Sequence, residues 1–201
     1  MFKNNYLFCT ILLLGLLTIV NSQLYSFTPY HGSTSCKGQP HGVGFGAIEF
    51  QCSLNFSNDA SFMIYNIYDT NQYNLSYHLH PYCSDYVHDQ VFDLGACTYS
   101  PWAYTAYMFT KVDTFQRVKI PSKSVVFQAT NSNCLSVQSY WYATNGTVIS
   151  DRGDPWGTTQ YYCQKGQPFQ RRCTPNAPCL SGPIMMDACS SDNPWRVTCS
   201  Q

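Results

Sequence analysis

The distribution of cysteines constrains this chain more than any other feature of its sequence. Ten cysteines remain after an N-terminal signal is set aside, and five of them lie between residue 163 and the C-terminus. An even number of cysteines behind a secretion signal is typical of a protein stabilised by disulfide bonds. Zinc is disfavoured because structural zinc sites use close CxxC pairs, and no such pair occurs. We therefore expect disulfides among Cys36, Cys52, Cys83, Cys97, Cys134, Cys163, Cys173, Cys179, Cys189 and Cys199.

The first 22 residues have the pattern of a cleaved secretory signal. Lys3 is followed by an uncharged, largely apolar run over residues 6–20, and small Ser22 closes the segment. The run is shorter than the roughly 20 residues that cross a bilayer comfortably. Cleavage after Ser22 is therefore expected. The product should be secreted, extracellular and without stable membrane insertion.

The charge of the chain excludes some partners and suggests attached sugar. Without Lys3 the chain has 11 − 1 = 10 basic residues against 11 acidic ones, so it offers no basic surface for nucleic acid. Charged residues make up only 11% of the chain, so other polar groups must provide solubility. Sequons for N-glycosylation occur at Asn55, Asn74 and Asn145. Asn145 is the best candidate because Asn-Gly favours a hairpin turn.

The fold is predicted to be all-β, a disulfide-rich sandwich or open barrel. Aromatic residues make up 16% of the chain and favour half-buried strands. The turn signals Asn58-Asp59, Pro121-Ser122 and Asn145-Gly146 separate short apolar runs. Expected strands are 43–56, 61–68, 74–80, 103–111, 115–120, 124–129, 135–143, 147–150 and 158–164. The strand over 103–111 should be buried on both sides, since both of its faces are apolar.

Two parts are expected after the signal. Residues 23–156 should form the sandwich-like body, and residues 157–201 a short, cysteine-dense C-terminal segment. Each part has five cysteines, so full pairing requires at least one bridge between them. The segment should therefore be docked on the body. Because it has few large aliphatic residues, we expect Cys173→Ser to unravel the segment before the body.

No motif in the sequence predicts catalysis, a cofactor or a metal. His78 and His80 form an HxH pattern, but spacing alone is weak evidence for a metal, and two hydrogen-bonded histidines are the simpler interpretation. Glu49 is the only glutamate, whereas glycosidases usually need two placed carboxylates. The GxSxG signature of serine hydrolases is absent. The glycine run over 41–46 lacks the lysine of a phosphate loop and is interpreted as a turn or bulge where a strand starts.

The abundant aromatic rings point to binding. Flat rings in and beside strands can pack against the C–H face of a sugar, and the candidates for ligand contact are Trp141, Trp156 and Tyr161. Trp102 belongs to the same group of rings. We expect a non-enzymatic protein that binds glycans of the extracellular matrix or cell surfaces, or another secreted protein. The alternatives are a secreted hydrolase or lytic (antimicrobial) factor, and a structural coat or matrix component.

Three stretches resemble a known group of proteins. QLYSFTPYHGSTSCKG opens the expected mature chain, GVGFGA follows, and PFQRRC precedes the clustered cysteines. Together they resemble a family of small secreted proteins of dictyostelid slime moulds whose function is unknown. The resemblance covers nearly all of the mature chain and implies secretion and a disulfide-bonded fold. It implies no activity and no catalytic residues.

Overall fold

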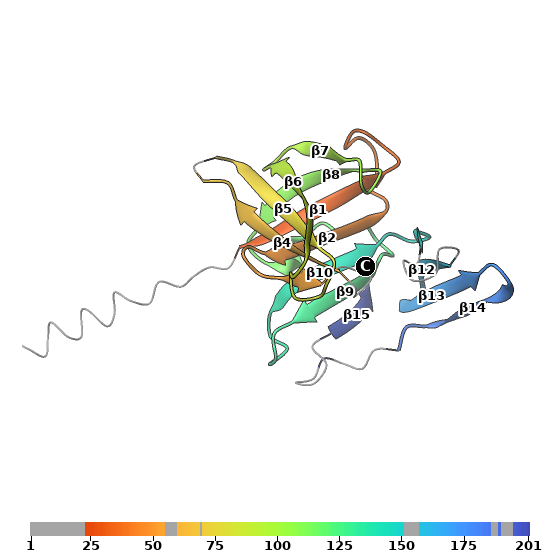
Figure 1. Cartoon of the computed structure of the whole chain (residues 1–201). Helices are drawn as coiled ribbons and strands as arrows, with labels where there is room; N and C mark the ends of the chain where they lie inside the picture. The colour runs from red at the N-terminus through yellow and green to blue at the C-terminus, as the bar shows by residue number, and fades with distance from the viewer. Residues whose placement is uncertain (1–22, 55–59, 69, 151–156, 186–188, 190–194) are drawn as a thin grey trace, which may run out of the picture.

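A seven-stranded antiparallel sheet forms the centre of the computed structural model, which describes residues 23–54, 60–68, 70–150, 157–185, 189 and 195–201. The expected signal over 1–22 lies outside these residues. The strand order is β15-β9-β10-β2-β1-β8-β7 (Figure 1). In that order the strands span Trp195–Cys199, Val125–Thr130, Val137–Ala143, Val43–Ile48, Leu24–His31, Thr105–Val112 and Cys97–Ser100.

Two four-stranded antiparallel sheets complete the fold. One has the order β3-β4-β5-β6 and consists of Ser53–Leu54, Ser61–Asn66, Gln72–His78 and Tyr86–Asp93. The other has the order β11-β12-β13-β14 and consists of Val148–Ser150, Thr158–Gln164, Gln167–Thr174 and Ala177–Pro183. The prediction of an all-β, sandwich-like fold is confirmed. Among the described strands, no sheet closes into a barrel, which is consistent with a sandwich.

The main core lies between the seven-stranded sheet and the β3–β6 sheet. Phe27 of β1 is fully buried, and its ring lies 4.6 Å from that of Phe45, 4.6 Å from that of Phe109 and 4.9 Å from that of Phe92 (centroid distances). Such a cluster buries large aromatic area and gains further from its edge-to-face pairs. As expected, β8 is buried on both faces over its first half.

The β11–β14 sheet packs beside this core, against the β9 and β10 end of the seven-stranded sheet. Here Phe127 and Trp141 contact Tyr161 of β12 and Trp195 of β15. The C-terminal strand β15 pairs with β9, so it belongs to the central sheet, although it follows the β11–β14 sheet in sequence. The β11–β14 sheet also begins before residue 157, because β11 pairs with β12.

The expected strand over 115–120 is not a strand. A 3₁₀ helix, η1, spans Phe115–Arg117, and the chain then continues without regular pairing to Pro121. The apolar residues of this stretch cover the second face of the central sheet, where Phe115 packs edge-on against Tyr140 with ring centroids 5.0 Å apart. The stretch is apolar because these residues pack against the central sheet, although the stretch itself is not a strand.

The glycine run over 41–46 agrees with its interpretation as a turn or bulge at a strand start only at Gly42, which comes just before β2. Gly44 and Gly46 lie inside β2, and a Cβ on either would come within 2.5 Å of the ring of Tyr142 or Tyr140. The two glycines therefore make room for tyrosines of the neighbouring strand β10, a use of glycine within strands where another group approaches closely. Only Gly42, just before β2, has a positive φ, of 110°.

All ten expected cysteines are paired, which confirms the disulfide prediction. Cys134–Cys189 is the bond that joins residues 23–156 to residues 157–201, and the short Cys173–Cys179 bond closes the β13–β14 hairpin. The five disulfides are Cys36–Cys97, Cys52–Cys83, Cys134–Cys189, Cys163–Cys199 and Cys173–Cys179.

Candidate functional site

A cavity of about 200 Å³ opens at one end of the sandwich, between the central sheet and the β3–β6 sheet. The strands that meet there bring aromatic side chains together because their inward-facing positions continue the core to its edge. The cavity is lined mainly by apolar atoms, and its principal residues are Phe45, Phe62, Tyr77, Ser100, Trp102 and Tyr107.

Three stacked rings form one side of this cavity. His88 of β6 stacks on Tyr77 of β5, with ring centroids 4.6 Å apart, and on Trp102, with centroids 4.7 Å apart. Trp102 follows β7 and is 71% exposed. Burial of the Tyr77 hydroxyl, reinforced by nearby Tyr107, raises its pKa above the ordinary value, so Tyr77 is neutral at physiological pH. The stack presents an exposed aromatic surface at the mouth of the cavity.

A buried hydroxyl lies in this apolar lining. Ser100, the last residue of β7, is 1% exposed, and its Oγ forms no hydrogen bond with any described residue. A buried polar group without a partner destabilises a fold by about 1–3 kcal/mol. Such groups are uncommon and call for an explanation. A ligand with a polar atom in the cavity would supply the missing hydrogen bond.

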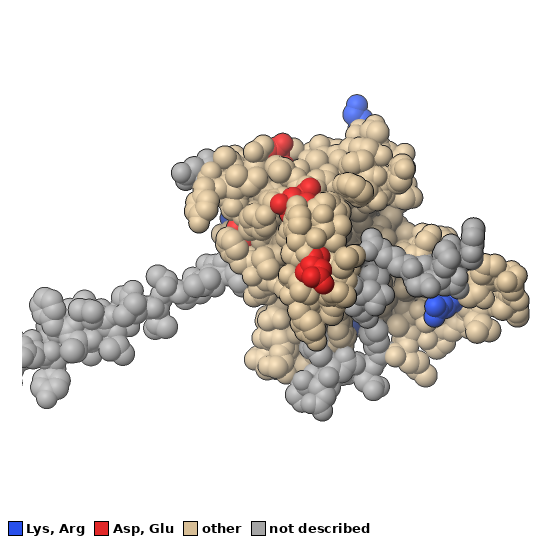
Figure 2. Space-filling view, in the orientation of Figure 1, with Lys and Arg blue, Asp and Glu red and all other residues tan. Residues whose placement is uncertain are grey.

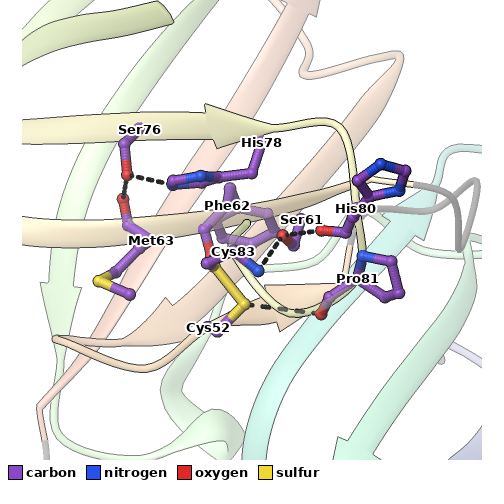
Figure 3. Close-up of a disulfide and its surroundings, with 9 residues drawn as sticks. All are labelled: Cys52, Ser61, Phe62, Met63, Ser76, His78, His80, Pro81 and Cys83. Carbon is purple, nitrogen blue, oxygen red and sulfur yellow. Dashed lines mark hydrogen bonds between the residues drawn. A yellow bond between two sulfur atoms is a disulfide. The ribbon is translucent and has the colours of Figure 1, made fainter. Parts of the chain in front are cut away.

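The Cys52–Cys83 disulfide fixes the loop beside the cavity (Figure 3). Ser61 Oγ donates to the carbonyl of His80 and accepts from the backbone N–H of Cys83 at 2.9 Å. These bonds hold the loop that follows β5, and Leu79 of this loop lines the cavity. The wall is therefore fixed before any ligand arrives, which lowers the entropic cost of binding.

The two histidines of the HxH pattern have different partners. His78 Nε2 forms a hydrogen bond with Ser76 Oγ (dashed line in Figure 3), over a distance of 3.1 Å. His80 Nε2 instead lies 3.1 Å from Asp85 Oδ2. β5 ends at His78, so the regular alternation that would align the two imidazoles stops there. Among the described residues, no group of three or more His, Cys, Asp or Glu side chains is placed to hold a metal.

Two of the predicted ligand-contact residues, Trp141 and Tyr161, lie away from this cavity. Trp141 is only 5% exposed, because its ring is stacked on Phe127 with centroids 3.7 Å apart and Tyr161 packs against its edge at 5.6 Å. Trp141 thus offers no open face, and Tyr161 is half-buried in the same cluster. Trp156 lies outside the described residues. Trp102 has the exposed ring that contact with a sugar requires. The sequence signal for this exposure is its neighbour Pro101, which favours the turn after β7.

The three sequons differ in their surroundings. Asn145 is exposed in the turn between β10 and β11, where the N–H of Thr147 donates to the carbonyl of Thr144 at 2.9 Å. Asn74 is 8% exposed within β5, and its Nδ2 donates to the Tyr65 hydroxyl. Asn55 lies outside the described residues.

The surface is poor in charge, as the view in Figure 2 illustrates. Within the described part of the chain, no helix is both long and apolar enough to cross a membrane. The residues around the cavity include no Asp, Glu, Lys or Arg side chain among those described. The arrangement is thus suited to an uncharged ligand with a flat or apolar surface.

Comparison with known proteins identifies one match. A family model described as "Counting factor-associated protein A/B/C" matches residues 4–201. No curated protein matches, and neither does any solved structure.

Proposed function

Because the chain belongs to the counting factor-associated protein A/B/C family, a dictyostelid family as the sequence resemblance indicated, we propose that it is a secreted, non-enzymatic binding protein. Its ligand is a neutral glycan, bound at the Trp102 cavity. The family description names an association and so supports a binding role. It also gives the family a functional description, whereas the resemblance implied none.

The observation that carries the proposal is the exposed Trp102 ring over an uncharged cavity. Sugar rings pack their C–H faces on exposed aromatic rings, and a few polar groups then fix the hydroxyls. Ser100 Oγ is such a group, since it lies in the lining without a partner among the described residues. The lack of a carboxylate among the described lining residues favours binding over glycoside hydrolysis, which usually needs two.

The test is binding of the secreted, oxidised protein to an array of neutral and charged glycans, with Trp102→Ala beside it. We expect saturable binding to neutral glycans that Trp102→Ala weakens at least tenfold. Binding that survives Trp102→Ala unchanged would place the site elsewhere, and release of sugar products would establish the hydrolase alternative.

A second candidate is association with a protein, as the family description states for counting factor. Its structural support is β14, which lies at the edge of the β11–β14 sheet and has mostly exposed residues, including Leu180 at 75%. An exposed edge strand can pair with a strand of a partner. Replacing Ser181 with Pro, which removes a backbone donor from the edge strand, should weaken such a complex while leaving glycan binding unchanged.

A further inference from the structure

A second cavity, of about 520 Å³, lies directly beside the first. Val43, Ala103 and Tyr107 line both cavities, so the two share a wall and lie side by side at the end of the sandwich. The second cavity is more open and is lined further by His31, His41, Thr105, Thr144, Asn145 and Thr147.

The polar groups of the second cavity are held in place by their own hydrogen bonds. His31 Nδ1 lies 3.0 Å from Thr105 Oγ1, which fixes the imidazole at the end of β1. Thr144 Oγ1 accepts from the N–H of Gly42 at 2.8 Å and lies 2.8 Å from Thr147 Oγ1. Ordered hydroxyls and imidazoles of this kind suit hydrogen bonding to sugar hydroxyls.

Two backbone segments pack closely against each other beside the second cavity, the end of β1 and the residues just before β2. His41 N–H donates to the carbonyl of Pro29, and His31 N–H donates to the carbonyl of His41, both at 3.0 Å. Gly42 follows His41 and precedes β2. It has a φ of 110°, and a Cβ at this position would lie 2.8 Å from His31 Cβ. Only glycine fits this position without displacing the histidine.

We infer that the two cavities together bind a neutral oligosaccharide of at least two sugar rings. The inference rests on the proposed function. The first cavity is smaller than the roughly 300–1,000 Å³ of drug-sized pockets and accommodates a single ring against Trp102. The next ring of the chain lies among the hydroxyls and imidazoles of the second cavity. Neither lining has an Asp, Glu, Lys or Arg side chain among the described residues, which matches an uncharged glycan over an anionic one.

The test compares neutral sugars of increasing length. Glucose, mannose and N-acetylglucosamine, each as a series of one to six linked units, are titrated by calorimetry into oxidised protein made in a host that attaches no N-linked sugar. Asn145 lines the second cavity and is left unchanged, and a sugar attached to it would stand at the rim of that cavity. In one series, we expect affinity to rise at least tenfold from one unit to two or three, and then to level off.

A variant confined to the second cavity isolates its contribution. Val148 lines that cavity and is 58% exposed, so Val148→Trp should fold while filling the space, and Val148→Ala is the matched control. We expect Val148→Trp to abolish the gain with length and to leave binding of the single unit unchanged. Affinity independent of length, or equal loss for short and long sugars, overturns the two-ring site but leaves the Trp102 site standing. Absence of binding to every sugar overturns the proposed function as well.

Discussion

Trp102 stacks on His88 with ring centroids 4.7 Å apart and ring planes at 29° to each other. The two rings come from the turn after β7 and from β6, hence from the two sheets that enclose the cavity. His88 in turn stacks on Tyr77. An exposed tryptophan is thus held at the mouth of the cavity by a ring that belongs to the opposite sheet.

Replacement of Trp102 should separate binding from stability. Because its side chain is 71% exposed, Trp102→Ala is expected to change the free energy of unfolding by no more than about 1 kcal/mol, since large losses come from buried sites. Glycan affinity should fall at least tenfold. Denaturant unfolding measures the change in stability, and calorimetry on the same samples measures the change in glycan affinity. A large loss of stability would mean that the tryptophan holds the sheets together and would contradict its assignment to ligand contact.

Trp141→Ala is the matched control and should behave in the opposite way. The ring is 5% exposed and packs on Phe127 and Tyr161, so truncation leaves a cavity that costs about 3–5 kcal/mol. The midpoint of denaturant unfolding should drop accordingly. Protein that remains folded should keep its glycan affinity, since Trp141 does not line the Trp102 cavity. A loss of affinity without a loss of stability would return the site to Trp141.

The sequons should differ in occupancy. N-linked sugar is attached through the side-chain amide, and in Asn74 that amide is buried and hydrogen-bonded to Tyr65. Asn145 is exposed in its turn. We expect glycopeptide mass spectrometry of secreted protein to find sugar on Asn145 and unmodified Asn74. Asn145→Gln should increase electrophoretic mobility, whereas Asn74→Gln should not. Sugar on Asn74 would require β5 to depart from its pairing with β4 and β6.

Local sequence patterns could predict much of the fold but little of the site. The expected strand over 158–164 coincides with β12, because its ends are marked by turn residues. The strands β1, β6, β7, β13, β14 and β15 are absent from the sequence prediction. β1 contains Pro29, β6 is an exposed edge strand with acidic residues, and β7 has only four residues. The other three lie in the cysteine-dense C-terminal segment. Pairing of β15 with β9 is a contact between distant parts of the chain, which periodicity does not encode.

The site depends on such distant contacts even more strongly. Trp141 and Trp102 both have aromatic neighbours in the sequence, so the sequence alone does not distinguish them. Alternation along a strand separates its two faces but does not reveal which face a second sheet covers. The β11–β14 sheet covers Trp141 through Tyr161, whereas the β3–β6 sheet leaves Trp102 at its rim. The choice between the two rings therefore required the arrangement of all three sheets.

The disulfides should contribute unequally to stability. Cys173 and Cys179 are 6 residues apart, whereas Cys36 and Cys97 are 61 apart. In the chain-entropy model, these loops correspond to about 2 and about 4 kcal/mol. Removal of both cysteines of the short loop should open only the β13–β14 hairpin, because β15 stays paired with β9. The sequence analysis expects loss of Cys173 to unravel all of residues 157–201, whereas the strand pairing limits the expected opening to β13 and β14.

Hydrogen exchange and denaturant unfolding of the two double serine variants provide the comparison. The Cys173→Ser, Cys179→Ser protein should lose protection in β13 and β14 alone, with glycan affinity retained. The Cys36→Ser, Cys97→Ser protein should lose stability throughout. Loss of protection across the central sheet in the first variant would show that the hairpin and the sandwich unfold as one unit.

Alkaline pH should unfold the protein through its buried tyrosines. Burial raises the folded-state pKa of Tyr77, Tyr107 and Tyr140 above the ordinary value of about 10. The folded state therefore holds these protons more tightly than the unfolded state. The contribution of these tyrosines to the free energy of unfolding is fully present below a pH of about 10. It is lost as the pH rises above that value, because the tyrosines ionise more easily in the unfolded chain.

Each such tyrosine steepens this fall by up to about 1.4 kcal/mol per pH unit. The ultraviolet absorbance of tyrosinate from the buried rings should rise only at the pH where circular dichroism reports unfolding. Tyr140→Phe should make the dependence of stability on pH shallower by one proton. Smooth ionisation of all tyrosines near pH 10 in folded protein would mean that these hydroxyls are accessible to solvent.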